Sequence, residues 1–96
     1  MMGYTYILLC NDSTFYVGST RDLARRIAQH KSGDGSAYTR KRRPVRLVYI
    51  EEYETVTEAY GRERQIHGWT HGRKRQLVRD GPGISVNPDT ESQLLT

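Results

Sequence analysis

The apolar segments of this 96-residue chain are short, and this limits its fold more than any other feature. The longest uninterrupted apolar run covers residues 6–10, far below the roughly 18 residues that a membrane-spanning helix requires. Hydrophobic residues make up 35% of the sequence. We therefore expect one small domain with a thin core, because a chain of this size has little apolar surface to bury in a second module or around a deep pocket.

The single cysteine and the N-terminal sequence restrict the class of protein further. Cys10 has no partner for an internal disulfide, and one thiol cannot form a four-thiolate zinc site. The first residues show neither the basic start nor the long apolar stretch of a signal peptide. The sequence therefore predicts a small soluble cytoplasmic protein that does not associate with a membrane.

Three segments are typical of β-strands. Residues 4–9 and 14–17 are rich in strand-forming residues and are separated by a turn sequence, which predicts an antiparallel hairpin. Residues 45–53 predict a third strand. Regular alternation would place Leu47, Tyr49 and Glu51 on one face of this strand and Val48 and Ile50 on the other.

Three segments carry helix signals. Residues 19–22 resemble a capping box that opens a helix, which should end near Gly33. Residues 55–58 form a second capping box, and residues 70–79 predict a last basic helix. We therefore expect an α+β fold with the order β-β-α-β-α-α, in which a small, three-stranded, mostly antiparallel sheet is flanked by helices. Residues 1–82 would form the single domain, and residues 83–96, which show no periodicity, a flexible tail.

The charge distribution favours a polyanionic partner. The net charge is +4, and all 15 lysines and arginines lie between Arg21 and Arg79. Such a basic body attracts nucleic acid, although a solvated basic face of a soluble domain remains an alternative. The candidates for nucleic-acid contacts are Arg25, Tyr38, Arg40, Lys41, Arg42, Arg43, His67, Arg73 and Lys74.

Polar side chains interrupt the apolar stripes of two predicted helices. At 100° per residue, Arg26 and His30 lie along the edge of the first stripe, and Glu63 points where the second helix should be apolar. A carboxylate near a core must be paired, hydrogen-bonded or bound to a metal. A salt bridge to a neighbouring arginine is the simpler alternative to a functional role.

The tyrosines of the predicted hairpin have two interpretations. Tyr6 and Tyr16 suit a half-buried sheet, where tyrosine is a favourable residue. A phenol beside a phosphate could instead order or deprotonate a water molecule. The spacing alone does not decide between these interpretations.

Several motifs together resemble the GIY-YIG nuclease domain, and the resemblance covers residues 4–79. The motifs are Tyr4-Thr5-Tyr6, Tyr16-Val17-Gly18, residues 22–30 and residues 58–66. The basic stretch 37–44, followed by Leu47-Val48-Tyr49, resembles the small stand-alone bacterial branch of that family. Two positions depart from the family pattern. Tyr4 replaces the leading glycine, and His67 replaces the lysine usual in this branch.

The resemblance implies a metal-dependent phosphodiesterase and assigns roles to five residues. Tyr16 would orient or deprotonate the attacking water, and Tyr6 would line the site. Arg26 would hold the scissile phosphate, with His30 hydrogen-bonded nearby in a position suited to a proton relay. Glu63 would ligate one divalent cation, Mg²⁺ or Mn²⁺. The implied catalytic set is Tyr6, Tyr16, Arg26, His30 and Glu63.

Three functional hypotheses follow. The first is an endonuclease that nicks DNA, directed by DNA structure. The second is a nucleic-acid-binding module with little or no cleavage, acting on RNA or with a protein partner that supplies recognition. The third is RNA binding by stacking, with Tyr38 as the platform. A zinc site of Glu63, His67 and His71 is a further alternative, although Gly68 interrupts the helix between the histidines. We expect a monomer or a weak homodimer.

Overall fold

A four-stranded antiparallel sheet with the order β2-β1-β3-β4 forms the centre of the computed structural model, which describes residues 2–95. The strands are β1 (Gly3–Leu9), β2 (Phe15–Thr20), β3 (Arg46–Tyr53) and β4 (Ile84–Ser85). The helices are α1 (Leu23–Ser32), α2 (Ala37–Arg40), α3 (Val56–His67), α4 (His71–Asp80) and α5 (Pro88–Leu94). The predicted α+β class, with an antiparallel sheet flanked by helices, is confirmed.

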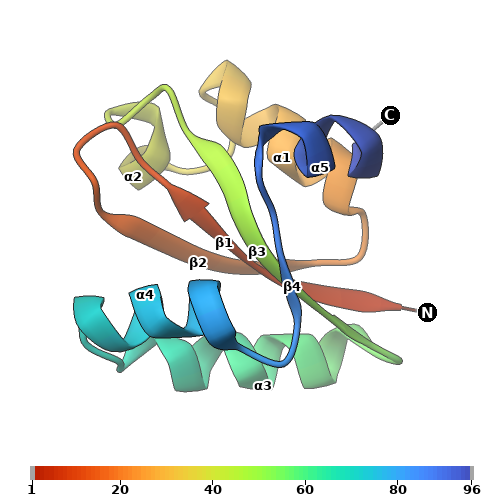
Figure 1. Ribbon diagram of the computed structural model, residues 1–96. Helices are drawn as coiled ribbons and strands as arrows, with labels where there is room; N and C mark the ends of the chain where they lie inside the picture. Colours follow the sequence, from red (N-terminus) through yellow and green to blue (C-terminus); the bar gives the residue numbers. More distant parts are fainter. Residues whose placement is uncertain (1, 96) are drawn as a thin grey trace.

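Helices cover both faces of the sheet and divide the core into two parts. Helices α1, α2 and α5 lie on one face, and α3 and α4 lie on the other (Figure 1). The buried residues of the first part are Tyr6, Leu8, Cys10, Ile27, Val45, Leu47, Ile50 and Val86. Those of the second part are Ile7, Val17, Val48, Tyr49, Ile66 and Leu77. No helix within residues 2–95 has the length and apolar character needed to cross a membrane.

The hairpin and several helix ends form where the sequence predicts them. Strands β1 and β2 pair antiparallel, with Tyr6 opposite Gly18. Thr55 and Thr70 cap α3 and α4 by accepting hydrogen bonds from the backbone two or three residues into each helix. Helix α1 ends at Gly33, whose φ of 96° is the left-handed conformation that glycine adopts without strain.

The predicted start of the first helix is wrong by three residues. Ser19 and Thr20 remain in β2, because they continue its pairing with β1 through the partners Thr5 and Tyr4. The residue that caps α1 is Asp22, whose carboxylate accepts a hydrogen bond from the backbone N–H of Arg25. The extended strand therefore takes the hydroxyl side chains away from the helix terminus.

The predicted faces of the third strand are also wrong. Leu47 and Ile50 belong to one part of the core, whereas Val48 and Tyr49 belong to the other. The pairing of β1 with β3 shifts between Ile7, which lies opposite Tyr49, and Leu8, which lies opposite Leu47. A bulge of this kind inserts one extra residue and breaks the alternation of side chains.

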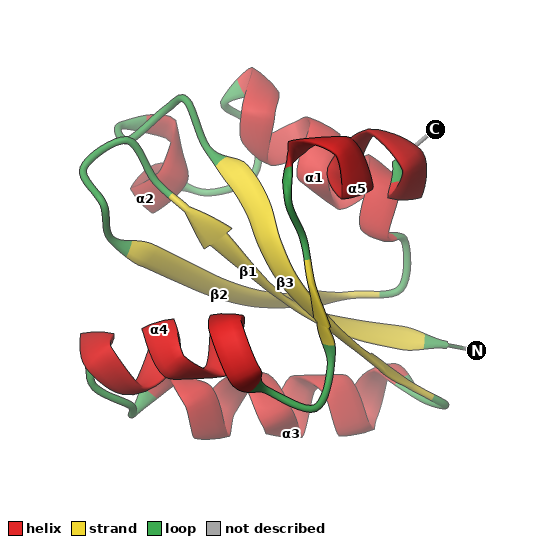
Figure 2. Cartoon of the chain, in the orientation of Figure 1, coloured by secondary structure: helices red, strands yellow, loops and turns green. Residues whose placement is uncertain are grey.

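Residues 83–95 differ most from expectation, because they form β4 and α5 rather than a segment without regular structure. Val86 is buried in the core. The Glu91 carboxylate accepts a hydrogen bond from the backbone N–H of Leu47 at 2.6 Å and pairs with Lys31 at 2.9 Å. This segment adds a fourth strand to the predicted three, and β4 pairs antiparallel with β3 at Tyr49 and Ile50 (Figure 2). Its two-residue strand and mostly polar helix are too short to show a period in the sequence.

Gly18 should be intolerant of substitution because the Tyr6 side chain occupies the space beside it. A Cβ atom at residue 18 would overlap the Tyr6 hydroxyl and ring. We expect Gly18→Ala to lower the free energy of unfolding by about 1–3 kcal/mol, the usual cost of forcing an extra methyl group into a packed site. Urea denaturation of the purified variant measures this change.

Gly61 provides the matched control in the same measurement. It lies within α3, and a Cβ atom there would meet nothing within 4 Å. Gly61→Ala should therefore raise the free energy of unfolding by about 0.5–1 kcal/mol, because alanine loses less conformational entropy in a helix than glycine does. Equal stability of the two variants would contradict the packing argument.

Candidate active site

A buried chain of hydrogen bonds connects β1, α1 and α2. The Tyr6 hydroxyl lies 2.7 Å from Nε2 of His30, and Nδ1 of His30 lies 2.8 Å from the Thr39 hydroxyl. All three side chains are fully buried. Both ring nitrogens of His30 are therefore occupied, and the ring orientation is fixed by groups on two other elements.

Burial keeps both titratable members of this chain neutral. Burial, together with the nearby Arg26 charge, lowers the pKa of His30 to about 4, so one ring nitrogen donates and the other accepts at neutral pH. Burial raises the pKa of Tyr6 to about 12, although a hydrogen bond from Arg26 opposes this effect. Tyr6 is therefore a hydrogen-bonding group at this site and not a base.

Tyr16 lies against this chain from β2. Its half-buried ring is centred 5.0 Å from the His30 ring and 6.5 Å from the Tyr6 ring. No group within residues 2–95 hydrogen-bonds to the Tyr16 hydroxyl. This phenol is thus free to bind a water molecule or a phosphate oxygen.

Arg26 contributes a positive charge that no carboxylate in the described part of the chain neutralises. Its guanidinium donates to the Gln29 side chain at 3.2 Å and to the backbone carbonyl of Gly35 at 3.0 Å. It also lies close enough to the Tyr6 hydroxyl to oppose the rise of that pKa. Because these partners are neutral, the charge remains available to an anion.

Glu63 lies on α3 and approaches β2 from the face of the sheet opposite to α1 (Figure 1). One of its carboxylate oxygens accepts a hydrogen bond from the Ser19 hydroxyl at 2.6 Å, and the other lies 3.2 Å from Nε2 of His67. The Glu63 charge is close enough to raise the pKa of Tyr6. Gly18 lies opposite Tyr6 in β2, next to the Ser19 that donates to Glu63. The expected carboxylate on an inner helix face is therefore hydrogen-bonded to a serine and a histidine, and not to an arginine.

The zinc site considered from the sequence does not form. Within residues 2–95 there is no group of three or more histidine, cysteine or acidic side chains that could hold a metal ion. The His71 ring instead stacks on Phe15, with ring centres 4.9 Å apart. Glu63 thus stands as a single carboxylate beside one imidazole.

The residues expected to contact nucleic acid are spread over both helical layers. Most of them are exposed, and Arg42 and Lys74 are half-buried. The Arg42 guanidinium pairs with Asp12 at 3.0 Å and lies 3.7 Å from the centre of the Tyr38 ring. The Arg73 guanidinium lies 3.9 Å from the centre of the Trp69 ring. The exposed members are Arg25, Tyr38, Arg40, Lys41, Arg43, His67 and Arg73.

Two residues at this site are absent from the sequence prediction. The sequence predicts that Ser19 caps α1, but its hydroxyl donates a hydrogen bond to Glu63. The Thr39 hydroxyl hydrogen-bonds to Nδ1 of His30. Continuing the strand alternation from Val17 to Ser19 would have placed Ser19 on the α3 face. No local signal identifies Thr39, because its contact depends on how α2 packs on α1.

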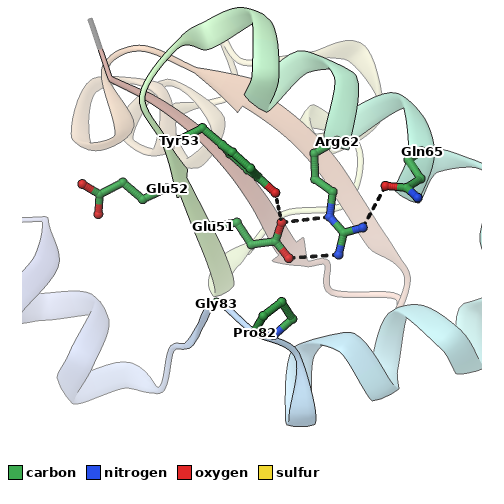
Figure 3. A pocket seen from close by; sticks show the side chains of 7 residues that line it. All are labelled: Glu51, Glu52, Tyr53, Arg62, Gln65, Pro82 and Gly83. Atoms are coloured by element: carbon green, nitrogen blue, oxygen red, sulfur yellow. Dashed lines mark hydrogen bonds and ion pairs between the residues drawn. The ribbon is translucent and has the colours of Figure 1, made fainter.

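A second polar cluster surrounds Glu51 and Arg62 (Figure 3). Arg62 binds both carboxylate oxygens of the buried Glu51, at 2.8 and 3.1 Å, and donates to Gln65 at 2.8 Å. The hydroxyls of Tyr49 and Tyr53 each donate to Glu51 at 2.6 Å. The cluster lines a cavity of 490 Å³ with Pro82 and Gly83.

The contacts of this second cluster indicate a structural role. Burial would raise the pKa of Glu51, but the hydrogen bonds from Arg62, Tyr49 and Tyr53 outweigh it and lower that pKa. The Arg62 guanidinium is already engaged by Glu51 and Gln65, so little of its hydrogen-bonding capacity remains for a ligand. The pair instead fixes α3, which carries Glu63, against β3.

Comparison with known proteins identifies the family of this chain. The model of the GIY-YIG catalytic domain matches residues 2–76. The chain belongs to the GIY-YIG family. The UPF0213 protein of Haloquadratum walsbyi is 42% identical over 82 residues, which cover 85% of this chain and 92% of that protein. The UPF0213 protein of Staphylococcus epidermidis is 41% identical over 78 residues, covering 81% and 95% of the two chains.

Two solved structures are also similar to this member of the GIY-YIG family. The solution structure of a UPF0213 protein from Bacillus halodurans is 37% identical, with a TM-score of 0.56 over 100% of this chain and 98% of the other. A protein from E. faecalis is 41% identical, with a TM-score of 0.57 over 82% and 84% of the two chains. The predicted resemblance to the small stand-alone branch is thereby confirmed.

The buried His30 should make stability depend on pH. The unfolded chain binds a proton at His30 near pH 6.5, whereas the folded chain does so only near pH 4, so stability is lost as the pH falls through this window. We expect this residue alone to lower the free energy of unfolding by about 3 kcal/mol between neutral pH and pH 4. Urea denaturation at a series of pH values measures the slope.

His30→Gln is the variant that isolates this effect, because glutamine can hydrogen-bond but does not titrate. Its stability should change less steeply with pH than that of the parent in the same window, even if it is less stable overall. Parallel pH profiles for the two proteins would show that His30 is not held neutral by the fold.

Proposed function

We propose that this GIY-YIG protein is an endonuclease that nicks DNA by hydrolysing a phosphodiester bond with the help of one divalent cation, Mg²⁺ or Mn²⁺. The observation that carries the proposal is the grouping of an uncompensated Arg26 with Tyr6, Tyr16 and His30, opposite the Glu63 carboxylate at β2. This combination brings an arginine that can bind an anion, a phenol that can bind water and a carboxylate to one strand.

Arg26 would bind the scissile phosphate. Its present partners are neutral acceptors, so a phosphate oxygen can replace one of them with a stronger, charge-assisted hydrogen bond. The guanidinium would then stabilise the negative charge that grows on the phosphoryl oxygens during hydrolysis. Preorganised charge of this kind is commonly the largest contribution to such catalysis.

Tyr16 would orient or deprotonate the attacking water, because its hydroxyl has no partner within residues 2–95. Tyr6 and His30 would act differently. With a raised pKa for Tyr6 and a lowered pKa for His30, both stay neutral and would line the site as hydrogen-bonding groups. Thr39 would position His30 for this role.

Glu63 would hold the divalent cation. Its side chain is 18% exposed, and its partners, Ser19 and His67, are hydrogen-bonding groups that can turn aside for an ion. Mg²⁺ binds through one or two carboxylates and completes its coordination with water and phosphate oxygens, so a single glutamate fits this ion. When bound, the cation supplies positive charge beside the reacting phosphate.

The substrate would be held by the basic residues around this site. The candidates are Arg25, Tyr38, Arg40, Lys41, Arg42, Arg43, His67, Arg73 and Lys74. We propose DNA as the substrate because the family is a nuclease family, and RNA is the alternative that the same contacts would allow. The protein would act in the cytoplasm as a monomer or weak homodimer, and a protein partner could supply additional recognition.

A plasmid-nicking assay tests the proposal. Supercoiled DNA is incubated with the purified protein and Mg²⁺, Mn²⁺ or EDTA, and open circles are quantified on a gel. We expect nicking with either metal and none with EDTA. Glu63→Gln, Tyr16→Phe and Arg26→Ala should each lower the rate by about 10²–10³-fold, the usual cost of losing one transition-state contact.

Glu58→Gln is the matched control for Glu63→Gln. Glu58 is an exposed acid on the same helix, and glutamine can replace it in the capping box with Thr55. Its rate should equal that of the parent. Activity that persists in EDTA, or equally in Glu63→Gln, would refute the proposed enzyme, and DNA binding without cleavage would favour a binding module.

A further inference from the structure

A cavity of 330 Å³ lies along the outer edge of β2, beside the proposed catalytic groups. Its lining comes from both helical layers, since Tyr38 belongs to α2, His67 to α3 and Lys74 to α4. The full lining is Phe15, Tyr16, Val17, Tyr38, His67 and Lys74. Three of these six side chains are aromatic carbocycles, and two are basic.

The aromatic side chains offer surfaces for a flat ligand. The Tyr38 ring is centred 6.0 Å from the Tyr16 ring, at an angle of 32°. Phe15 stacks nearly parallel on His71, with 22° between the ring planes. Nucleobases stack on such rings with little regard to sequence, because every base has a π face.

Tyr38 is exposed and yet held in one orientation. It is 36% exposed, but its hydroxyl donates to Thr14 at 2.7 Å and the Arg42 guanidinium lies 3.7 Å from its ring centre. Tyr60 on α3 is 50% exposed, and the Arg64 guanidinium lies 5.8 Å from its ring centre. An aromatic ring fixed at the rim of a cavity is preorganised for stacking, since little side-chain freedom is lost on binding.

We propose that this cavity binds an unpaired nucleobase next to the phosphodiester that is cut, so that the substrate class is DNA with an unpaired nucleotide at the cleavage position. The inference rests on the proposed function, because Tyr16 is shared by the cavity and the catalytic group. Tyr38 would stack on the base, and Lys74 would contact the adjoining phosphate.

A base within a continuous duplex is not available to stack on Tyr38. A base pair has both faces covered by its neighbours, so its bases reach Tyr38 only after unstacking, which costs a few kcal/mol and least for an unpaired base. The Tyr16 ring lines the cavity and is centred 6.0 Å from the Tyr38 ring and 5.0 Å from the His30 ring, so the base cavity and the catalytic group are one side chain apart. The nucleotide recognised is therefore the one that carries the reacting phosphate or its immediate neighbour.

The test is a binding measurement in EDTA with the full chain carrying Glu63→Gln, which prevents cleavage. The probes are a DNA duplex with one unpaired 2-aminopurine and the same duplex with 2-aminopurine paired to thymine. We expect tighter binding and fluorescence quenching only with the unpaired probe. Adding Tyr38→Leu should weaken binding to the unpaired probe by about 5- to 150-fold, which corresponds to the loss of one stacked base.

Two control variants test whether the binding preference depends on the aromatic ring of Tyr38. Tyr38→Phe retains the ring and should retain the preference, whereas Tyr60→Leu removes an exposed tyrosine from elsewhere and should leave binding to both probes unchanged. Circular dichroism establishes that each variant is folded. Equal affinity for the two probes, or an unchanged preference in Tyr38→Leu, would overturn the proposal.

A cleavage assay with the parent protein separates this inference from the proposed function. Cleavage of both duplexes at equal rates in Mg²⁺ would refute the base site and leave the nuclease standing. A Tyr38-dependent preference in binding, with no cleavage by the parent protein, would support the base site and refute the nuclease.

Discussion

The pairing of Tyr6 with Gly18 across β1 and β2 is the contact on which the rest of the site depends. The absence of a side chain at residue 18 leaves room for the Tyr6 phenol, which then reaches His30 at 2.7 Å. His30 in turn reaches Thr39, so one strand, one long helix and one short helix are fixed by a single chain of hydrogen bonds. Because these groups are buried and neutral, the chain resists distortion without the cost of a buried charge.

The edge strand β2 is where the two faces of the sheet contribute to one site. Tyr16 points from β2 toward the His30 ring, and Ser19 points from the same strand toward Glu63 on α3. A small domain has too little core to enclose a deep pocket. At an edge strand, side chains from both faces of the sheet are accessible side by side. The cavity next to Tyr38 lies along the same edge and is also lined by the basic residues His67 and Lys74.

The position of Glu63 depends on a second polar network that takes no part in the proposed chemistry. The buried Glu51 receives four hydrogen bonds from Arg62, Tyr49 and Tyr53, and Arg62 lies one residue before Glu63 on α3. A buried ion pair is worth little unless its hydrogen bonds are satisfied, and here they are. The network thus ties α3 to β3, while Glu63 on the neighbouring face of the helix remains partly exposed.

The sequence by itself determined the α+β class, the β1–β2 hairpin, the cap of α3, the position of α4, and the family, because each of these depends on local periodicity, turn residues or a motif. It also indicated Arg26, His30 and Glu63 as polar side chains on inner helix faces. Only the tertiary structure decided the bulge in β3, the return of residues 83–95 onto the sheet, and the roles of Ser19 and Thr39. Those features follow from contacts between residues far apart in the chain, such as Ser19 with Glu63 or Glu91 with Leu47, whose energy no local pattern encodes.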